Sequence, residues 1–197
     1  MSKRLTAVAL ASQSPRRCEL LRGLGLEVTV VRSGFDEGSV PWDREPAALA
    51  LDFARRKAAA AEGGGPPLVI AADTVVVIDD EVLGKPSDAD QAVWMLRKLS
   101  GREHVVHTGF AVVDRAAQLQ RDGVNSTRVR FLPLSEPQIA GYVATGDPFD
   151  KAGAYGIQGR GALLVSSIDG DFYTVMGLPL ARVGEALAQL DYDLFAQ

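Results

Sequence analysis

Apolar residues along the chain fall into two kinds of pattern, and each kind predicts a different element. Residues 68–78 (LVIAADTVVVI) form an almost unbroken β-branched run, typical of a strand that is covered on both faces. In residues 89–99 and 180–190 the apolar residues recur at the spacing of one helix face. The same criteria predict further strands at 6–11, 27–33, 103–113, 118–132, 162–168 and 172–176, and further helices at 15–24, 46–62 and 136–145.

The order of these predicted elements indicates the fold class. Strands and helices mix without strict alternation, which favours a mixed sheet in an α/β protein. Ser87 with Asp90 and Ser135 with Gln138 have the spacing of capping boxes, which mark helix starts. Residues 169–170 (Asp-Gly) supply a turn for a hairpin between the last two predicted strands.

Composition narrows the class of protein further. With 197 residues, of which 47% are hydrophobic, the chain can bury a full core as one domain, 1–197, or as two lobes that share one sheet. The net charge is −4 and no basic face stands out, which argues against nucleic-acid binding. No apolar run reaches the ~18 residues of a membrane span. The single cysteine, Cys18, excludes an internal disulfide and is typical of a cytoplasmic protein.

Asp73 is the most informative residue, because it interrupts the apolar strand at 68–78. An isolated ionised carboxylate in an apolar interior costs many kcal/mol, so Asp73 must be paired, hydrogen-bonded, metal-bound or protonated, or lie where the strand opens into a cleft. The alternative is a structural aspartate that backbone N–H groups satisfy. The pattern alone leaves both interpretations open.

A candidate anion site lies at residues 12–17 (SQSPRR), where the first predicted strand meets a helix. Ser14 suits the N-cap, and the free N–H groups of a helix N-terminus attract anions. Arg16 and Arg17 oppose the helix dipole there unless an anion neutralises them. With Ser12, these residues are candidates for binding an anionic ligand, and the alternative is an ordinary cap with two solvated arginines.

Two lysines are further candidates. Lys57 falls on the apolar side of helix 46–62, where it either extends to the surface or points into a cleft that holds an anion. Lys85, in a Gly-Lys-Pro segment, does not belong to a P-loop, because no Ser or Thr follows it. A lysine fixed beside a proline could still contact a phosphate.

The remaining candidates lie in loops. Asp36 and Glu37 form an acidic pair that is either solvated or, with Asp73, able to hold Mg²⁺. The segment 150–161 contains several glycines, which allow a ligand to approach the backbone, and Gln158 offers both a donor and an acceptor. Residue chemistry therefore indicates cations and acids that converge on a polyphosphate with a divalent metal.

Five segments in order along the chain carry a resemblance to a known family. Together they resemble the Maf family of nucleotide pyrophosphatases, whose fold is similar to that of inosine triphosphate pyrophosphatases. The resemblance covers nearly the whole chain and implies a mixed, strongly twisted central sheet flanked by helices, with two lobes around a cleft. The segments are LASQSPRRCELL (10–21), AADTVVV with VLGKP (71–86), MLRKLSG (95–101), DKAGAYGIQG (150–159) and VMGLPL (175–180).

The resemblance also implies roles for single residues. Asp73 matches the family's general base, and Glu37 matches an acid near the metal, to which Asp73 would also contribute. Gln13 departs from the family, which often has Gly there. Three positions match residues that set specificity, namely Arg16, Thr74 and Gln158, and their identities look like the branch that acts on dTTP and UTP. Positions near the triphosphate are matched by Ser12, Arg17, Lys57 and Lys85, and Ser14 belongs to the same phosphate loop.

By this resemblance, the chain is expected to cleave nucleoside triphosphates between the α and β phosphates. The expected function is house-cleaning of nucleotide pools, with a divalent cation (Mg²⁺ or Mn²⁺) as cofactor and a homodimer as the assembly. The alternative is a nucleotide-binding regulator of septum formation with little turnover. Asp73 favours the enzyme, because a sensor of anions gains nothing from a negative charge that faces the phosphates.

Overall fold

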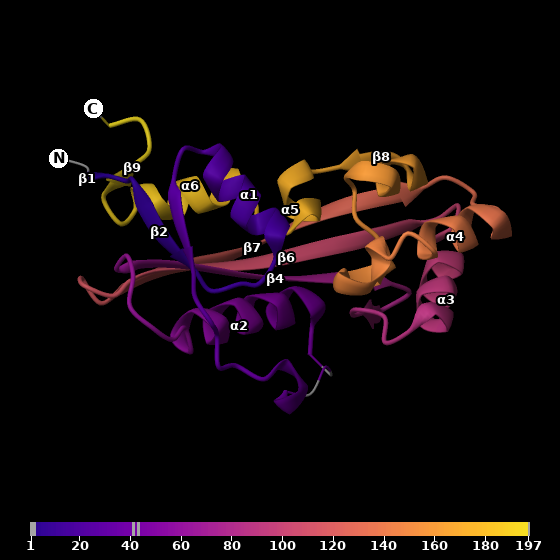
Figure 1. Cartoon of the computed structure of the whole chain (residues 1–197), viewed down its shortest axis with the longest axis horizontal. Helices are drawn as coiled ribbons and strands as arrows, with labels where there is room; N and C mark the ends of the chain where they lie inside the picture. The colour runs from indigo at the N-terminus through magenta and orange to yellow at the C-terminus, as the bar shows by residue number, and fades with distance from the viewer. Residues whose placement is uncertain (1–2, 41, 43, 197) are drawn as a thin grey trace. The chain divides into compact units, whose positions relative to one another are not determined.

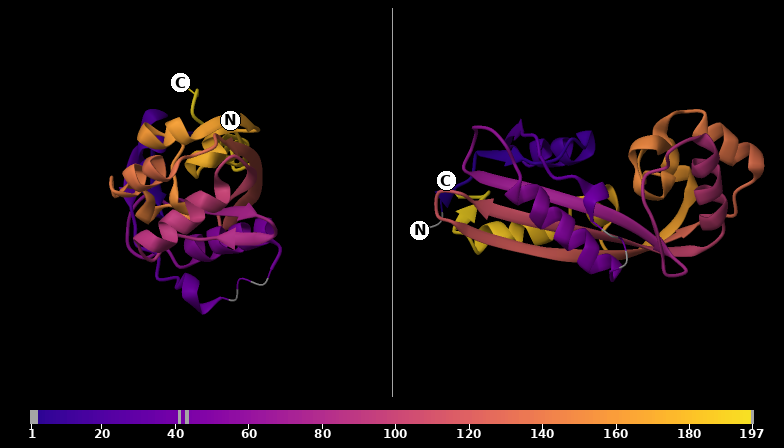
Figure 2. Two further views of the ribbon diagram at one scale, coloured as in Figure 1. Left: turned by 90° about the vertical axis from the view of Figure 1, so that its right-hand side faces the viewer. Right: turned by 90° about the horizontal axis from the view of Figure 1, so that it is seen from below.

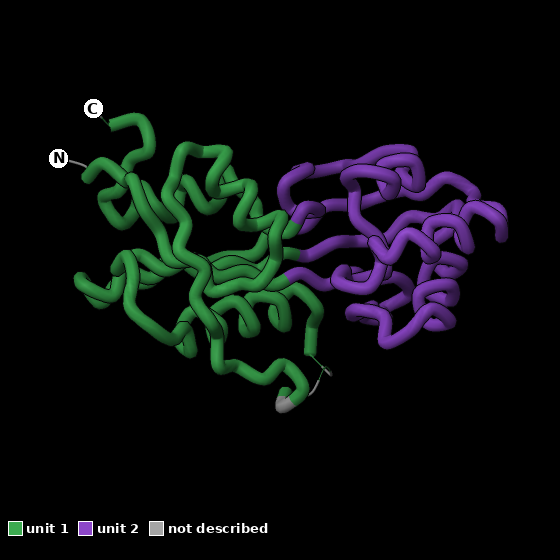
Figure 3. Tube along the Cα trace, viewed as in Figure 1, with its two compact units in different colours: residues 1–73, 108–125, 177–197 green, residues 74–107, 126–176 purple. Residues whose placement is uncertain are grey.

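The computed structural model describes residues 3–40, 42 and 44–196, and the chain divides into two compact units (Figure 3). Each unit has a hydrophobic cluster of its own. Unit 1 comprises residues 1–73, 108–125 and 177–197, and unit 2 comprises residues 74–107 and 126–176.

Figure 1 shows the helices and strands along the chain. The strands are β1 (Lys3–Arg4), β2 (Ala7–Leu10), β3 (Glu27–Val30), β4 (Leu68–Ile78), β5 (Glu81–Leu83), β6 (Glu103–Asp114), β7 (Leu119–Phe131), β8 (Val165–Asp169) and β9 (Tyr192–Asp193). The α-helices are α1 (Pro15–Gly23), α2 (Pro46–Ala59), α3 (Ala89–Leu99), α4 (Glu136–Val143), α5 (Phe172–Met176) and α6 (Leu180–Ala188). Short 3₁₀ helices are η1 (Glu37–Ser39), η2 (Asp147–Asp150), η3 (Ala152–Ala154) and η4 (Gly159–Leu164).

The strand pairing confirms the predicted α/β class with a mixed sheet. Hydrogen-bonded strands follow the order β3-β2-β4-β6-β7-β8, and β5 pairs with β4. β2 is parallel to both β3 and β4, whereas β4 with β5 and β7 with β8 are antiparallel. No helix in the described residues combines the length and apolar character that crossing a membrane requires.

In unit 1, helices cover both faces of the sheet. α1 and α6 lie on one face and α2 lies on the other, as Figure 1 and the right panel of Figure 2 show. Ile70 and Ala72 of β4 belong to the cluster formed with α1 and α6, whereas Val69 and Ala71 belong to the cluster on the α2 side. Because side chains alternate along a strand, Asp73 is placed on the face that α2 covers.

A glycine in β6 sets how closely α2 approaches this face. A Cβ atom built on Gly109 would lie 2.3 Å from the carbonyl oxygen of Ala50, in α2. Only a residue without a side chain therefore allows the helix backbone to rest on the strand at this point. This close approach allows a side chain on the inner face of α2, that of Lys57, to reach β4.

Unit 2 has a separate core, in which α3 and α4 pack with the strands. Apolar residues of both helices share one cluster with Val76 and Ile78 of β4 and with Val129 and Phe131 of β7. Helix α4 begins with the predicted capping box, because the Ser135 N–H donates to Oε1 of Gln138 at 2.8 Å.

The predicted strand at 172–176 and the hairpin before it are wrong, because these residues form helix α5. The carboxylate of Asp171 accepts from the N–H groups of Tyr173 (3.3 Å) and Thr174 (2.7 Å), which is how an N-cap residue starts a helix. This local cap outweighs the β propensity of Phe172 and its neighbours. The predicted strand 162–168 starts only at Val165, because η4 occupies the residues before it.

Two further expectations need smaller corrections. The predicted Ser87–Asp90 capping box is wrong, because the N-cap of α3 is Asp88, whose carboxylate accepts from the Gln91 N–H at 2.8 Å. The helix predicted to run to residue 62 ends at Ala59, and Ala61 then forms an isolated antiparallel bridge with Ser33.

Candidate active site

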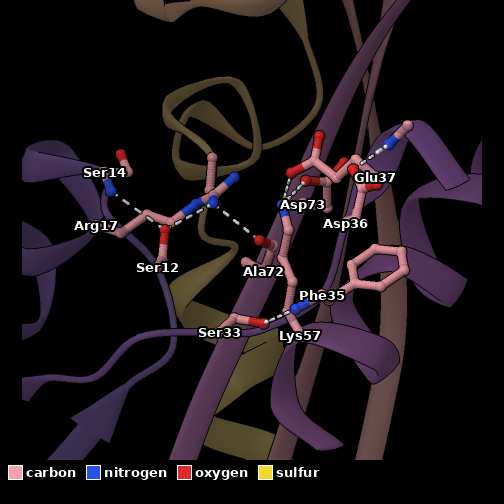
Figure 4. Close-up of polar contacts among 12 residues, drawn as sticks. Ser12, Ser14, Arg17, Ser33, Phe35, Asp36, Glu37, Lys57, Ala72 and Asp73 are labelled. Carbon is pink, nitrogen blue, oxygen red and sulfur yellow. Dashed lines mark hydrogen bonds and ion pairs between the residues drawn. The ribbon is translucent and has the colours of Figure 1, made fainter. Parts of the chain in front are cut away.

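The centre of the candidate site is the carboxylate of Asp73, which is only 8% exposed. Its Oδ1 atom accepts a hydrogen bond from Nζ of Lys57, in α2 (Figure 4). The same ammonium group forms an ion pair with Oε1 of Glu37 at 2.6 Å. One lysine therefore holds two carboxylates, one from β4 and one from η1.

Lys57 reaches this position because of its place on α2. Leu49 and Phe53, two turns and one turn before it, are fully buried, so the lysine extends from the inner face of the helix. Its side chain is 14% exposed, and its charge is balanced inside unit 1. Lys57 therefore does not extend to the surface, and its ammonium group faces the carboxylates of Asp73 and Glu37.

Burial is the main influence on the ionisation of Asp73. It raises the pKa of the carboxyl group above the ordinary value, while Lys57 and Arg17 act in the opposite direction. Glu37 adds a smaller contribution that raises the pKa further. A free aspartate is a weak base for water at neutral pH, so a raised pKa brings Asp73 closer to the range in which it can accept a proton.

Arg17 lies inside unit 1 rather than at its surface. Its Nε donates to the carbonyl oxygen of Gly177 at 2.7 Å, and its Nη1 donates to Ser12 Oγ at 3.0 Å and to the Ala72 carbonyl at 2.8 Å. Burial lowers the pKa of the guanidinium, against the attraction of Asp73. Arg17 thus ties the loop before α1 to the residue that precedes Asp73.

The rest of the loop before α1 surrounds this arginine. Ser12 Oγ accepts from the Ser14 N–H at 3.3 Å as well as from Arg17. Ser14 is the N-cap residue by position, with an extended backbone, but its hydroxyl makes no capping hydrogen bond. Arg16 is half-buried in the first turn of α1.

Three of the predicted site residues belong to unit 2. Thr74 follows Asp73 directly, so its side chain points to the opposite face of β4. Lys85 is exposed after β5, and Gln158 is exposed at the start of η4. The structure therefore gathers Ser12, Arg17, Glu37, Lys57 and Asp73 in unit 1, and places Thr74, Lys85 and Gln158 in unit 2.

Comparison with known proteins assigns the chain to a family. Residues 7–190 match the family model described as Maf-like protein. The chain belongs to the Maf-like family. A relative from Symbiobacterium thermophilum, named dTTP/UTP pyrophosphatase, is 52% identical over 94% of this chain and 95% of its own. A relative from Moorella thermoacetica with the same name is 50% identical over 98% of this chain and 100% of its own.

The fold is also similar to that of a solved structure. A HAM1 protein from Coxiella burnetii superposes with a TM-score of 0.43 and 19% identity, covering 94% of this chain and 100% of that protein.

The donor set of this Maf-like protein fits a divalent cation. Among the described residues, no group of three or more histidine, cysteine, aspartate or glutamate side chains is placed to hold a metal. Mg²⁺, however, is commonly bound by one or two carboxylates together with phosphate oxygens and water. Glu37 and Asp73, which share one ammonium group, are two such hard oxygen donors. Oδ1 of the neighbouring Asp36 accepts a hydrogen bond from the Gly38 N–H at 3.0 Å.

Sequence analysis missed two groups at this Maf-like site, the carbonyl oxygens of Ala72 and Gly177. Both accept from the buried Arg17. A main-chain carbonyl carries no signature in the sequence, and Gly177 lies 160 residues from Arg17. The segment VMGLPL (175–180), which contains Gly177, is marked in the sequence only by its resemblance to the family pattern.

Proposed function

We propose that this protein hydrolyses dTTP and UTP between the α and β phosphates, releasing the monophosphate and pyrophosphate. Such an activity removes unwanted nucleotides from cellular pools. The observation that carries the proposal is the buried Asp73 carboxylate, which shares Lys57 with Glu37. Relatives 41–52% identical to this chain bear the name dTTP/UTP pyrophosphatase, which supports the same substrates here.

The proposed chemistry is in-line attack of water on the α-phosphorus. Asp73 orients the water and accepts its proton, aided by the raised pKa of its carboxyl group. Lys57, Lys85 and the positive charge of Arg17 balance the charge that develops on the leaving pyrophosphate. A divalent cation held by Glu37 and Asp73 would neutralise phosphate charge and acidify the attacking water.

Base selectivity is assigned to Gln158, with Arg16 and Thr74. Uracil and thymine share an edge with an acceptor, a donor and an acceptor, whereas cytosine offers an acceptor at N3 and a donor at N4. A held Gln158 amide can accept from N3–H and donate to O4, and Arg16 supplies only donors. By analogy with bidentate base contacts, this preference is worth about 10- to 100-fold.

The test is pyrophosphate release from UTP, dTTP, CTP and 7-methyl-GTP, measured with Mg²⁺ or Mn²⁺ and after chelation with EDTA. UTP and dTTP should have the highest kcat/KM, and chelation should abolish turnover until metal is restored. Gln158→Glu, which replaces the amide donor with an acceptor, should lower kcat/KM for UTP.

Three outcomes would contradict the proposal. A nucleoside diphosphate as first product would move the attack to the γ-phosphorus. CTP or 7-methyl-GTP as the best substrate would make the specificity assignment wrong. Tight UTP binding without product under all metal conditions would favour a nucleotide-binding regulator instead.

A further inference from the structure

A hydrogen-bonded network in unit 2 runs from Lys151 to the loop that carries Gln158. Lys151 Nζ donates to Asp147 Oδ1 at 2.9 Å, and the hydroxyl of Tyr142 donates to Asp147 Oδ2 at 2.8 Å. The same hydroxyl accepts from the Gly156 N–H at 3.1 Å. The network therefore ends at the backbone N–H of Gly156, two residues before Gln158.

The ammonium group of Lys151 donates all of its hydrogens within this network and to neighbouring acceptors. Its side chain is 10% exposed, and Nζ also donates to the Asp147 carbonyl at 2.6 Å and to Asp150 Oδ1 at 2.8 Å. These three acceptor atoms, from two aspartates, use the three hydrogens of the ammonium group. Lys151 thus fixes η2 and the Asp147 carboxylate, and has no donor left for a phosphate.

The surroundings of Asp147 stabilise the ionised form of its carboxyl group. Burial opposes ionisation, but the hydrogen bonds from Lys151 and Tyr142 hold the pKa of the carboxyl group below its ordinary value. Asp147 is therefore a charged acceptor for both partners at neutral pH, and hydrogen bonds to a charged group are stronger than neutral ones.

The loop packs tightly against the same residues. A Cβ atom on Gly156 would lie 2.7 Å from Cε of Lys151, and one on Gly161 would lie 1.9 Å from the Gly156 carbonyl oxygen and 2.9 Å from the Tyr142 hydroxyl. The backbone at Gly161 therefore packs directly against the backbone at Gly156 and against the hydroxyl of Tyr142. Gln158 lies in the segment between these two fixed points.

A second anchor joins this loop to the segment that bears Lys85. The Gly153 N–H donates to the Gly84 carbonyl at 3.0 Å, and a Cβ atom on Gly153 would lie 3.0 Å from both methyl carbons of Val76, in β4. The main chain before Gln158 is thus fixed to the strand as well as to Tyr142.

We propose that Tyr142, Asp147 and Lys151 are positioning residues that set base selectivity through the Gln158 loop. This inference rests on the proposed function, in which Gln158 reads the base. A freely rotating amide fits cytosine as well as uracil, and the Gln158 side chain is exposed. Its orientation must therefore be set by the main chain, which this network holds.

The experiment compares the UTP/CTP ratio of kcat/KM in Tyr142→Phe and in wild type. Phe keeps the buried ring but removes both hydrogen bonds, so the ratio should fall about 3- to 10-fold, the equivalent of one ordinary hydrogen bond. Lys151→Met, which keeps the stem without the charge, should act in the same direction. Both variants should change KM more than kcat, because the reacting groups of unit 1 are untouched.

Tyr192→Phe is a matched control. The Tyr192 hydroxyl, like that of Tyr142, donates to an aspartate carboxylate, Asp114 Oδ2, at 2.8 Å, but in unit 1. Its loss should leave the UTP/CTP ratio unchanged. If all three variants lowered the ratio alike, the network would have no special role and the inference would fail.

Gln158→Ala separates this inference from the proposal on which it rests. If Gln158→Ala leaves the ratio unchanged, Gln158 does not read the base, and both the assignment of base selectivity to Gln158 and the positioning role fall, while the proposed hydrolysis does not. If Gln158→Ala abolishes selectivity but Tyr142→Phe and Lys151→Met do not, only the positioning role is wrong. Tyr142→Phe added to Gln158→Ala should cause no further loss of selectivity, and an additional loss would overturn action through Gln158.

Discussion

Two buried aspartates in the sheet of this protein have opposite surroundings. Asp73 lies within β4 and is 8% exposed, and Asp114 ends β6 and is 2% exposed. Oδ1 of Asp114 accepts from the N–H groups of Ala116 and Ala117, both at 3.0 Å, and its Oδ2 accepts from the Tyr192 hydroxyl. Asp73 instead bonds to the ammonium group of Lys57.

The difference appears in their ionisation. Main-chain hydrogen bonds, led by that of Ala117, lower the pKa of Asp114, whereas burial raises the pKa of Asp73. Asp114 is a satisfied structural aspartate, the alternative that the sequence left open for Asp73. A buried carboxylate that main-chain donors do not stabilise is the one suited to accept a proton or to contribute to a metal site.

The largest expected effect is on turnover. Asp73→Asn should lower kcat by about 10²- to 10⁴-fold, because a near-isosteric amide cannot act as a base. The melting temperature should not fall, since burial of the charge already opposes ionisation of Asp73 in the folded state. Both quantities should be measured on one preparation. A folded variant with more than a tenth of wild-type activity would end the assignment of Asp73 as the base.

The converse change should affect stability alone. Asp114→Ala removes the acceptor for two main-chain N–H groups and one hydroxyl, which should lower the free energy of unfolding by about 1–3 kcal/mol. Below its melting temperature the variant should retain a kcat close to wild type. A loss of kcat without a loss of stability would remove the distinction between the two aspartates.

The sequence predicts the surroundings of a buried aspartate only where the residues that bind it lie close to it along the chain. The interrupted apolar run draws attention to Asp73 without deciding between a functional and a structural carboxylate, and helical spacing predicts that Lys57 lies on the apolar face of its helix, because both signals are local. Asp114 gave no signal, since an aspartate at the end of a strand is typical of an ordinary turn. Its partner Tyr192 lies 78 residues away, beyond the reach of any local pattern.

The errors in the predicted fold have a similar physical origin. Aromatic and β-branched residues at 172–176 predict a strand, but the Asp171 carboxylate accepts from the N–H groups of Tyr173 and Thr174 and so starts a helix instead. Arg17 was predicted from the helix dipole, and its buried position depends on a carbonyl 160 residues away. Sequence patterns thus selected the charged candidate residues and could not predict which main-chain groups hold them.

The smallest expected effect is on the pH dependence of stability, where the two aspartates should act with opposite sign. The lowered pKa of Asp114 contributes stability above the ordinary aspartate pKa, and this contribution is lost as the pH falls through the lower folded value. The raised pKa of Asp73 makes its ionisation a cost at neutral pH, and the cost disappears as the pH falls through the raised value toward the ordinary one. Unfolding free energies between pH 3 and pH 8 should therefore show Asp73→Asn gaining on wild type as the pH rises, and Asp114→Asn losing against it. Parallel curves for both variants would mean that the two carboxylates titrate alike, which would refute the proposed difference between the two environments.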